Sequence, residues 1–409
     1  MRTRAIVFAM IFLFTLTIYG KDNSCITCHN DLDEEFVAGF IKSTHYKQGI
    51  LCHDCHGGNP AEEDMERSMS PKAGFKGKIP RKTIPTFCDR CHGDIEYMRN
   101  FNPSMRVDQY REYLTSIHGK LFKKGDKNVA VCTDCHTSHR IIPPNDLESS
   151  IHPANVAETC GECHNNSALM QSYGINANQY HLYKESIHAK MIYENKDYSA
   201  PTCNDCHGNH GAIPPGIRNI AEVCGQCHVL QAEFYEESFH SDIFENIGEP
   251  GCETCHSNHK IKQLTDEHLL NPDSSVCSTC HEEGDAGYSE NQKIAIIIAH
   301  LDSSYNVLLN KIENQEHSGI STEQARFDVQ QLKEVLVKLR VAVHGMSVKK
   351  LEPLQKEGLK VIEKVSKNIE LKQQDYINRK RGLYFSIILI LLTVIGIYFY
   401  IKFTYGEHT

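Results

Sequence analysis

The residues with the clearest chemistry are the cysteines, and all of them belong to one five-residue pattern, Cys-x-x-Cys-His. The chain of 409 residues has 18 cysteines and contains the pattern nine times. Two thiols at this spacing can form thioether bonds to the vinyl groups of a porphyrin, and the histidine that follows can bind the iron. The pattern therefore predicts nine covalently bound haem c groups. The predicted attachment residues are Cys25, Cys28, Cys52, Cys55, Cys88, Cys91, Cys132, Cys135, Cys160, Cys163, Cys203, Cys206, Cys224, Cys227, Cys252, Cys255, Cys277 and Cys280, and the predicted proximal ligands are His29, His56, His92, His136, His164, His207, His228, His256 and His281.

Paired cysteines have two other common uses, zinc binding and redox disulfides. A structural zinc site takes two such pairs in tetrahedral geometry, and a redox disulfide usually occurs once per domain. Neither use calls for a histidine directly after the second cysteine. With 24 histidines in 409 residues, a histidine would follow any one pair by chance about one time in 17. Nine occurrences out of nine favour haem.

The motifs fall into pairs that form an internal repeat of roughly 53 to 72 residues. We call the first motif of each pair the opening motif and the second the closing motif. The opening motifs begin at Cys25, Cys88, Cys160 and Cys224, and the closing motifs begin at Cys52, Cys132, Cys203 and Cys252. Cys277 starts a fifth unit that has no closing motif. The repeat indicates that the region grew by duplication.

Further histidines recur at fixed places in the repeat and are candidates for the second axial ligand that a six-coordinate haem iron needs. A Ser-x-His sequence separates the two motifs of each pair, and a fifth copy ends at His152. A second group trails the histidine of three closing motifs by three residues. These candidates are His45, His118, His188, His240, His152, His139, His210 and His259. One ligand is then still missing, and His300 and His344 are the candidates for it. The spacing leaves open which histidine serves which haem.

The fold class that these motifs imply is mainly α, with little regular structure in the haem region. Residues 25–281 provide roughly 29 residues per motif, too few to wrap each haem in an apolar core of its own. The porphyrins must therefore form most of the core, as in a stacked multihaem cytochrome c domain. We assign residues 21–288 to this domain.

After Ser289 the cysteines end and the apolar residues follow a helical period, which predicts a helical bundle over residues 289–378. Ser321 and Gln324 are typical of a capping box at the start of the second helix. Pro353 suits the first turn of a third helix. The three apolar stripes predict packing of helix against helix. Two stripes are Ile294, Ile297, Ile298, Leu301, Tyr305, Leu308, Leu309 and Ile312, followed by Ala325, Val329, Leu332, Val335, Leu336, Leu339 and Val343.

The two ends of the chain predict export and a membrane anchor. Residues 1–20 combine a basic start with a short apolar run, as in a signal peptide, although an uncleaved anchor remains an alternative. Residues 383–401 are apolar and uncharged, which is long enough for a single transmembrane helix. We assign residues 379–409 to this anchor and a short cytoplasmic tail. The haem domain is expected in the periplasm of a bacterium, on the outer face of the inner membrane. The basic residues 379–381 precede the span, and the positive-inside rule alone would place the side that they are on in the cytoplasm. Large domains are exported largely regardless of such charges, so we keep the periplasmic assignment.

The formal net charge of −9 bears on partners. This negative charge argues against nucleic acid as a binding partner and favours small redox proteins with basic faces. The predicted anchor implies contact with the membrane. It also makes a quinol-oxidising or b-type cytochrome subunit in that membrane the expected electron donor. No residue is assigned a catalytic role.

The motifs over residues 25–281 resemble those of multihaem cytochromes c with doubled Cys-x-x-Cys-His motifs, including pentahaem nitrite reductase and octahaem hydroxylamine oxidoreductase. The resemblance implies haems with two histidine ligands that act as a wire between redox partners. It also leaves a competing class open, a haem enzyme of the nitrite reductase or hydroxylamine oxidoreductase kind. Those nitrite reductases usually carry a lysine in place of the motif histidine, and all nine motifs here end in histidine. A direct quinol dehydrogenase is a further alternative to the relay.

Overall fold

The computed structural model of the chain describes residues 23–216, 220–271 and 273–405, and the predicted signal peptide lies outside these ranges. Every regular element in them is a helix, which confirms the mainly α fold class. The chain divides into two compact units. Unit 1 holds residues up to Pro215 together with Asn258–Lys262, and unit 2 holds Gly216–Ser257 and the rest of the chain.

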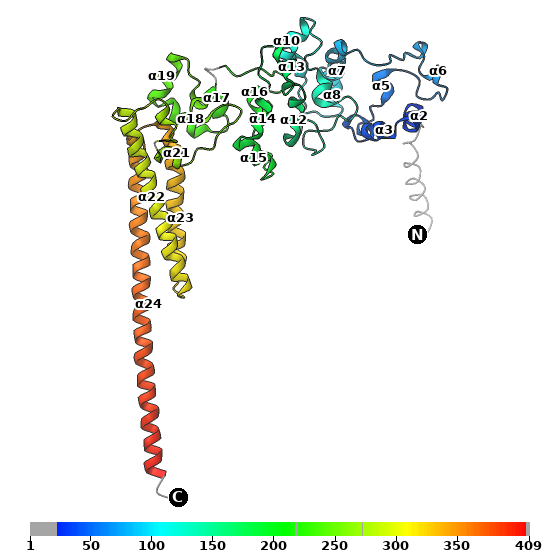
Figure 1. Cartoon of the computed structure of the whole chain (residues 1–409). Helices are drawn as coiled ribbons and strands as arrows, with labels where there is room; N and C mark the ends of the chain where they lie inside the picture. The colour runs from blue at the N-terminus through cyan, green and yellow to red at the C-terminus, as the bar shows by residue number, and fades with distance from the viewer. Residues whose placement is uncertain (1–22, 217–219, 272, 406–409) are drawn as a thin grey trace. The chain divides into compact units, whose positions relative to one another are not determined.

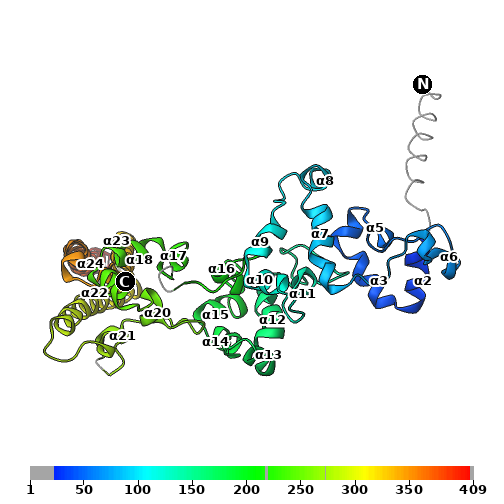
Figure 2. The ribbon, with the colours of Figure 1, turned by 90° about the horizontal axis from the view of Figure 1, so that it is seen from above.

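Unit 1 consists of short helices joined by loops (Figures 1 and 2). Its largest buried apolar cluster has three fully buried members, Ala157, Tyr183 and Ala189. So small a core fits the expectation that cofactors supply much of the interior. The helices are α2 (Ser24–Leu32), α3 (Glu34–Ile41), α4 (Thr44–Lys47), α5 (Cys52–His56), α6 (Met65–Ser68), η1 (Pro71–Ala73), η2 (Arg81–Thr83), α7 (Ile84–His92), α8 (Ile95–Arg99), α9 (Gln109–Thr115), α10 (Ile117–Lys123), α11 (Cys132–His136), α12 (Pro153–His164), α13 (Ser167–Gln171), α14 (Gln179–Lys184), α15 (Ile187–Tyr193) and α16 (Cys203–His207).

Three Ser-x-His sequences in unit 1 have a serine that starts a helix, namely Ser43, Ser116 and Ser186. The buried hydroxyl of Ser116 accepts a hydrogen bond from the backbone N–H of Gly119 at 2.9 Å, and Ser43 and Ser186 make the same bond at 3.1 Å. This is the N-cap interaction that serine favours. It fixes the histidine in the first turn of the helix, so the spacing between serine and histidine has a structural cause.

Successive repeats interlock through a backbone hydrogen bond that recurs three times. The residue after the serine donates its N–H to a carbonyl that lies two residues beyond the trailing histidine in the closing motif of the next repeat. The pairs are Thr44 to Ile141 (2.8 Å), Ile117 to Ala212 (3.1 Å) and Ile187 to Ile261 (3.0 Å). Each Ser-x-His segment therefore lies beside the trailing histidine of the following repeat. The last of these bonds helps to explain why Asn258–Lys262 belongs with unit 1.

Unit 2 combines three motifs with a bundle of three long helices (Figure 1). Its elements are α17 (Ile220–Gly225), α18 (Val229–Glu236), α19 (Phe239–Ile247), α20 (Gly251–His256), α21 (Glu267–Leu270), η4 (Cys277–Thr279), α22 (Ala286–His317), α23 (Glu323–Ala342), η5 (Val343–Gly345) and α24 (Val348–Tyr405).

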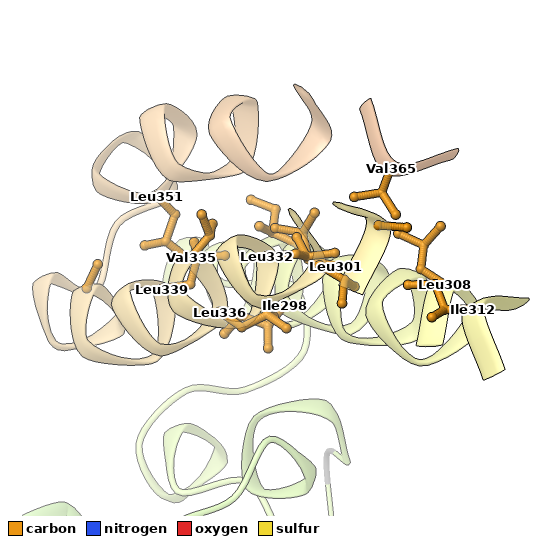
Figure 3. Packing of buried hydrophobic residues seen from close by; sticks show 14 of the residues in the cluster. Ile298, Leu301, Leu308, Ile312, Leu332, Val335, Leu336, Leu339, Leu351 and Val365 are labelled. Atoms are coloured by element: carbon orange, nitrogen blue, oxygen red, sulfur yellow. The ribbon is translucent and has the colours of Figure 1, made fainter. Parts of the chain in front are cut away.

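The bundle has an apolar core, which the side chains of the predicted stripes form (Figure 3). Leu301, Ile312, Leu332, Leu339 and Val365 are each 0% exposed. Burying a leucine or isoleucine side chain contributes about 1.5–3 kcal/mol. The bundle is therefore held by its own apolar contacts.

Helix α24 runs without a break from the bundle into the apolar segment. Its stretch Val348–Thr404 is long and apolar enough to cross a membrane, and its most apolar 18-residue window has a mean hydropathy of 2.4 and is not buried by the protein. This confirms one candidate span. The predicted boundary at residue 379 thus falls inside one continuous helix.

Two details of the predicted helix starts are wrong. Thr322, not Ser321, occupies the N-cap of α23, and its hydroxyl bonds Glu316, while Gln324 donates to Asp328 at 2.8 Å. The third helix begins at Val348, so Pro353 lies in its second turn.

Candidate haem-binding sites

The closing motifs of unit 1 form one-turn helices, and two local features set their shape. In α5, α11 and α16 the residue before the second cysteine is aspartate, whose carboxylate accepts a hydrogen bond from the residue that precedes the motif. The bonds to Asp54, Asp134 and Asp205 are each 2.7 Å. This contact resembles half of a capping box and closes the turn that carries both thiols.

The residue after the histidine of each closing motif has a left-handed backbone. Its φ is 69° at Gly57, 63° at Thr137, 85° at Gly208 and 66° at Ser257. A positive φ at threonine or serine is uncommon for residues with a Cβ. The reversal ends the short helix and turns the chain toward the trailing histidine. No residue that follows an opening motif has a positive φ in the described ranges.

The histidine of each closing motif faces a second imidazole whose plane is nearly parallel to its own. The ring centroids of His56 and His139 are 6.0 Å apart with planes 19° from parallel. The other three pairs are His136 with His210 (6.0 Å, 11°), His207 with His259 (6.0 Å, 15°) and His256 with His344 (6.2 Å, 7°).

The trailing histidine thus faces the closing motif of the preceding repeat and not its own. The fifth unit, which starts at Cys277, has no closing motif and therefore supplies no trailing histidine to the fourth closing motif. The helical region supplies His344 in its place, from η5 between α23 and α24.

Three opening-type motifs face a histidine of a Ser-x-His sequence, and here the planes are tilted. The pairs are His92 with His45 (5.9 Å, 51°), His164 with His118 (6.2 Å, 59°) and His281 with His240 (5.9 Å, 76°). In each pair the Ser-x-His sequence comes from the repeat before the motif. The repeat therefore produces two kinds of histidine pair, parallel and tilted.

These separations fit an iron placed between two imidazoles. A metal–imidazole bond of roughly 2.0–2.1 Å on each side, plus the two ring radii, gives a centroid separation of about 6 Å. Burial, followed by the nearby His210 and His92, lowers the pKa of His136 to about 4. Burial likewise lowers the pKa of His118 and of His344. The rings are therefore held neutral, the form that binds a metal.

The cysteines also fit covalent attachment. No disulfide joins any of the 18, all of which lie in the described ranges. Within those ranges, no group of three or more cysteine, histidine, aspartate or glutamate side chains could hold a metal ion. Seven of the nine thiol pairs stand beside a motif histidine that faces a second imidazole.

Within each unit, thiols of consecutive motifs are neighbours. A hydrogen bond that the thiol of Cys88 donates to Cys132, aided by burial, raises the pKa of Cys88. A hydrogen bond from Cys160 to Cys203 raises the pKa of Cys160 in the same way. Between repeats, burial and then Cys160 raise the pKa of Cys135.

The same contacts link the remaining motifs of each unit. Burial and then the nearby Cys25 raise the pKa of Cys52 to about 11. Burial raises the pKa of Cys55 as well, and Asp54 and Cys91 add to it. In unit 2 a hydrogen bond from the thiol of Cys224 to Cys252 raises the pKa of Cys224. Burial and then the nearby Cys277 raise the pKa of Cys255. The first six motifs in unit 1 and the last three in unit 2 therefore follow one another in space in chain order.

Comparison with known proteins agrees with this chemistry. Residues 44–165 match the family described as cytochrome c3, and residues 145–229 match cytochrome c7 and related cytochrome c. The chain is a multihaem c-type cytochrome. Its cofactor is therefore covalently bound haem c.

The cytochrome also has relatives among characterised proteins. It is 24% identical over 211 residues to the multihaem cytochrome MtrA of Shewanella baltica, a match that covers 48% of this chain and 56% of that protein. It is 22% identical over 126 residues to the C-type polyhaem cytochrome OmcC of Geobacter sulfurreducens, covering 30% of this chain and 15% of that protein. The cytochrome thus spans about half the length of the first relative and a smaller part of the second. No solved structure matches it.

Two candidate ligands of the cytochrome lie apart from its motif histidines. His152 is buried and caps α12, where its Nδ1 accepts a hydrogen bond from the N–H of Ala154 at 3.1 Å. Its ring packs edge-on against Tyr198 at 4.7 Å. His300 is exposed on α22. Of the two histidines considered for the missing ligand, His344 is the one that faces a motif.

The first motif differs from the others. The ring next to His29 is that of Phe36, with centroids 6.5 Å apart and planes 50° from parallel. The same phenyl ring packs edge-on against His139 at 4.5 Å. The amino-acid sequence offers one signal for this difference, because residues 1–24 contain no Ser-x-His sequence.

Proposed function

We propose that this cytochrome is a periplasmic electron relay with nine haems, anchored in the inner membrane by α24. It takes electrons from a quinol-oxidising membrane protein, such as a b-type cytochrome subunit, and passes them to soluble redox proteins. Kinship with the nitrite reductase and hydroxylamine oxidoreductase cytochromes stays a prediction.

The observation that carries the proposal is the succession of motifs in chain order. Cys88 lies against Cys132 within one repeat, and Cys135 lies beside Cys160 of the next. Haems attached at neighbouring thiols lie close enough to exchange electrons directly. Their paired imidazoles keep both axial positions filled, which favours electron transfer over catalysis.

The anchor determines what kind of donor can serve the relay. His344 precedes the start of α24 at Val348, and the apolar span begins at Leu383. At 1.5 Å per helical residue, an upright stalk of this length is about 50 Å long. The eighth haem would then stand well above the bilayer, out of reach of a quinol inside it. This spacing supports a separate donor protein with an extramembrane part.

Reconstitution in liposomes tests the proposal. The purified holoprotein is mixed with a reduced menaquinol analogue, with and without a quinol-oxidising b-type cytochrome, and haem reduction is followed by absorbance. We expect slow reduction of the cytochrome alone and fast reduction when the donor protein is present. Fast reduction of the cytochrome alone would make it a quinol dehydrogenase and would contradict the relay.

A further inference from the structure

The first motif, at Cys25 and Cys28, stands out because the ring beside its histidine is a phenyl ring, whereas an imidazole lies beside the histidine of seven other motifs. Phe36 is 6.5 Å from His29, close to the 5.9–6.2 Å of the histidine pairs. A phenyl ring has no lone pair and cannot bind iron. Among the residues that the structure describes, no histidine ring is in contact with His29.

The order of the repeat explains this difference. Each Ser-x-His sequence that contacts a motif serves the opening motif that follows it, as His45 serves His92 and His118 serves His164. Residues 1–24 contain no Ser-x-His sequence that could serve the first opening motif. At the other end of the series the analogous gap is filled by His344.

We propose that the haem at Cys25 and Cys28 keeps its distal position open and binds a small uncharged ligand there. The inference rests on the proposed attachment of nine haems and adds a binding activity to the relay.

The surroundings of Phe36 decide which ligand class the position suits. Phe36 lies at the start of α3, where its N–H donates to the carboxylate of Asp33 at 2.9 Å. The phenyl side chain is 38% exposed, so solutes can reach it. It offers an apolar face without a hydrogen-bond donor.

Local charge excludes anions. Four of the five residues before Phe36 are exposed acids, namely Asp31, Asp33, Glu34 and Glu35. Their charge disfavours nitrite or sulfite near the ring. A neutral molecule that accepts electron density from ferrous iron, of the carbon monoxide or nitric oxide type, fits both the apolar face and the charge.

Carbon monoxide binding to the dithionite-reduced full-length protein tests the inference. We expect one carbon monoxide per chain, and one high-spin haem in the ferric protein. Phe36→His should supply the missing imidazole, remove most of this binding and convert the high-spin haem to low-spin. Phe40→His is the matched control, because Phe40 is on the same helix but packs against Tyr46, and it should leave both signals unchanged.

His53 is a rival ligand, since it follows Cys52, which neighbours Cys25. We expect His53→Gln to leave the carbon monoxide count at one. A rise to two bound carbon monoxide molecules in His53→Gln would overturn the open site. So would a wild-type protein that binds none, or a wild-type count of one that Phe36→His does not lower. Binding that appears only when the protein is diluted to a monomer would also overturn it, because a second copy would then supply the ligand. Haem content is measured in parallel, so that fewer than nine haems would contradict the attachment, whereas nine haems without binding would contradict only this inference.

Discussion

The imidazoles of His256 and His344 lie 6.2 Å apart with their planes 7° from parallel, although one belongs to a haem motif and the other to the turn between two bundle helices. The Nδ1 of His344 lies 2.9 Å from the carbonyl oxygen of Val341, and this contact orients the ring. The bundle is therefore part of a candidate haem site and also leads into the candidate membrane span of α24.

Replacing His344 should affect one haem only. We expect His344→Ala to leave nine covalent haems and to make the haem at Cys252 and Cys255 high-spin, because its iron loses one imidazole. His300→Ala is the control, since that residue is exposed on α22. The ferric high-spin signal in electron paramagnetic resonance measures both. An increase in the His300 variant and none in the His344 variant would reverse the assignment.

The histidines of the Ser-x-His sequences should behave in the same way. His118→Ala and His188→Ala should each add one high-spin haem without loss of covalent attachment, the first of them at the motif of His164. The comparison is His152→Ala, which removes a helix cap and should lower the free energy of unfolding by about 1 kcal/mol without a change of spin state. Unchanged spectra in both ligand variants would mean that these histidines are only structural.

The two kinds of histidine pair should give two kinds of low-spin spectrum. Nearly parallel imidazole planes make the field at the iron rhombic, whereas planes that approach the perpendicular make it nearly axial and give a much larger maximal g value. His136 with His210 is 11° from parallel, and His240 with His281 is at 76°. We therefore expect both signals in the ferric protein, and His240→Ala should diminish only the signal with the larger g value. A single rhombic species would contradict the geometry.

The turn between α22 and α23 should make the bundle sensitive to acid. Hydrogen bonds from Arg326 and Thr322 lower the pKa of Glu316 from 4.5 to about 2. Because the pKa is lower in the folded protein, the stabilisation is present above pH 4.5 and is lost as the pH falls toward 2.

Thermal unfolding followed by circular dichroism measures this effect. Glu316→Gln should melt at a lower temperature than wild type at pH 7, and the difference should shrink below pH 4.5. Glu313→Gln, a change at an exposed position of the same helix, should differ little from wild type. A melting difference for Glu316→Gln that is the same at pH 7 and pH 3 would contradict the sign.

Much of the fold could be predicted from the sequence because its signals are local. The Cys-x-x-Cys-His pattern specifies its chemistry within five residues, and the stripe that includes Leu301 and Leu308 predicts a buried helix face, which the structure confirms. The continuity of α24 was harder to predict, because Pro353 usually marks the first turn of a helix and here lies in the second turn.

The pairing of histidines could not be predicted because it depends on how repeats interlock. The hydrogen bond from Ile117 to Ala212 places His210 beside the preceding repeat, and no local spacing encodes that contact. His152 shows the reverse difficulty. It shares the Ser-x-His spacing with true repeat members, but it caps α12 and packs against Tyr198.

The central claim is that every cysteine pair carries a haem, so that the chain is a nine-haem relay. The intact mass of the purified holoprotein, compared with the mass of the mature polypeptide, counts covalently attached haems directly. The account predicts a mass increase equal to nine haems. A mass increase that corresponds to fewer than nine would contradict it.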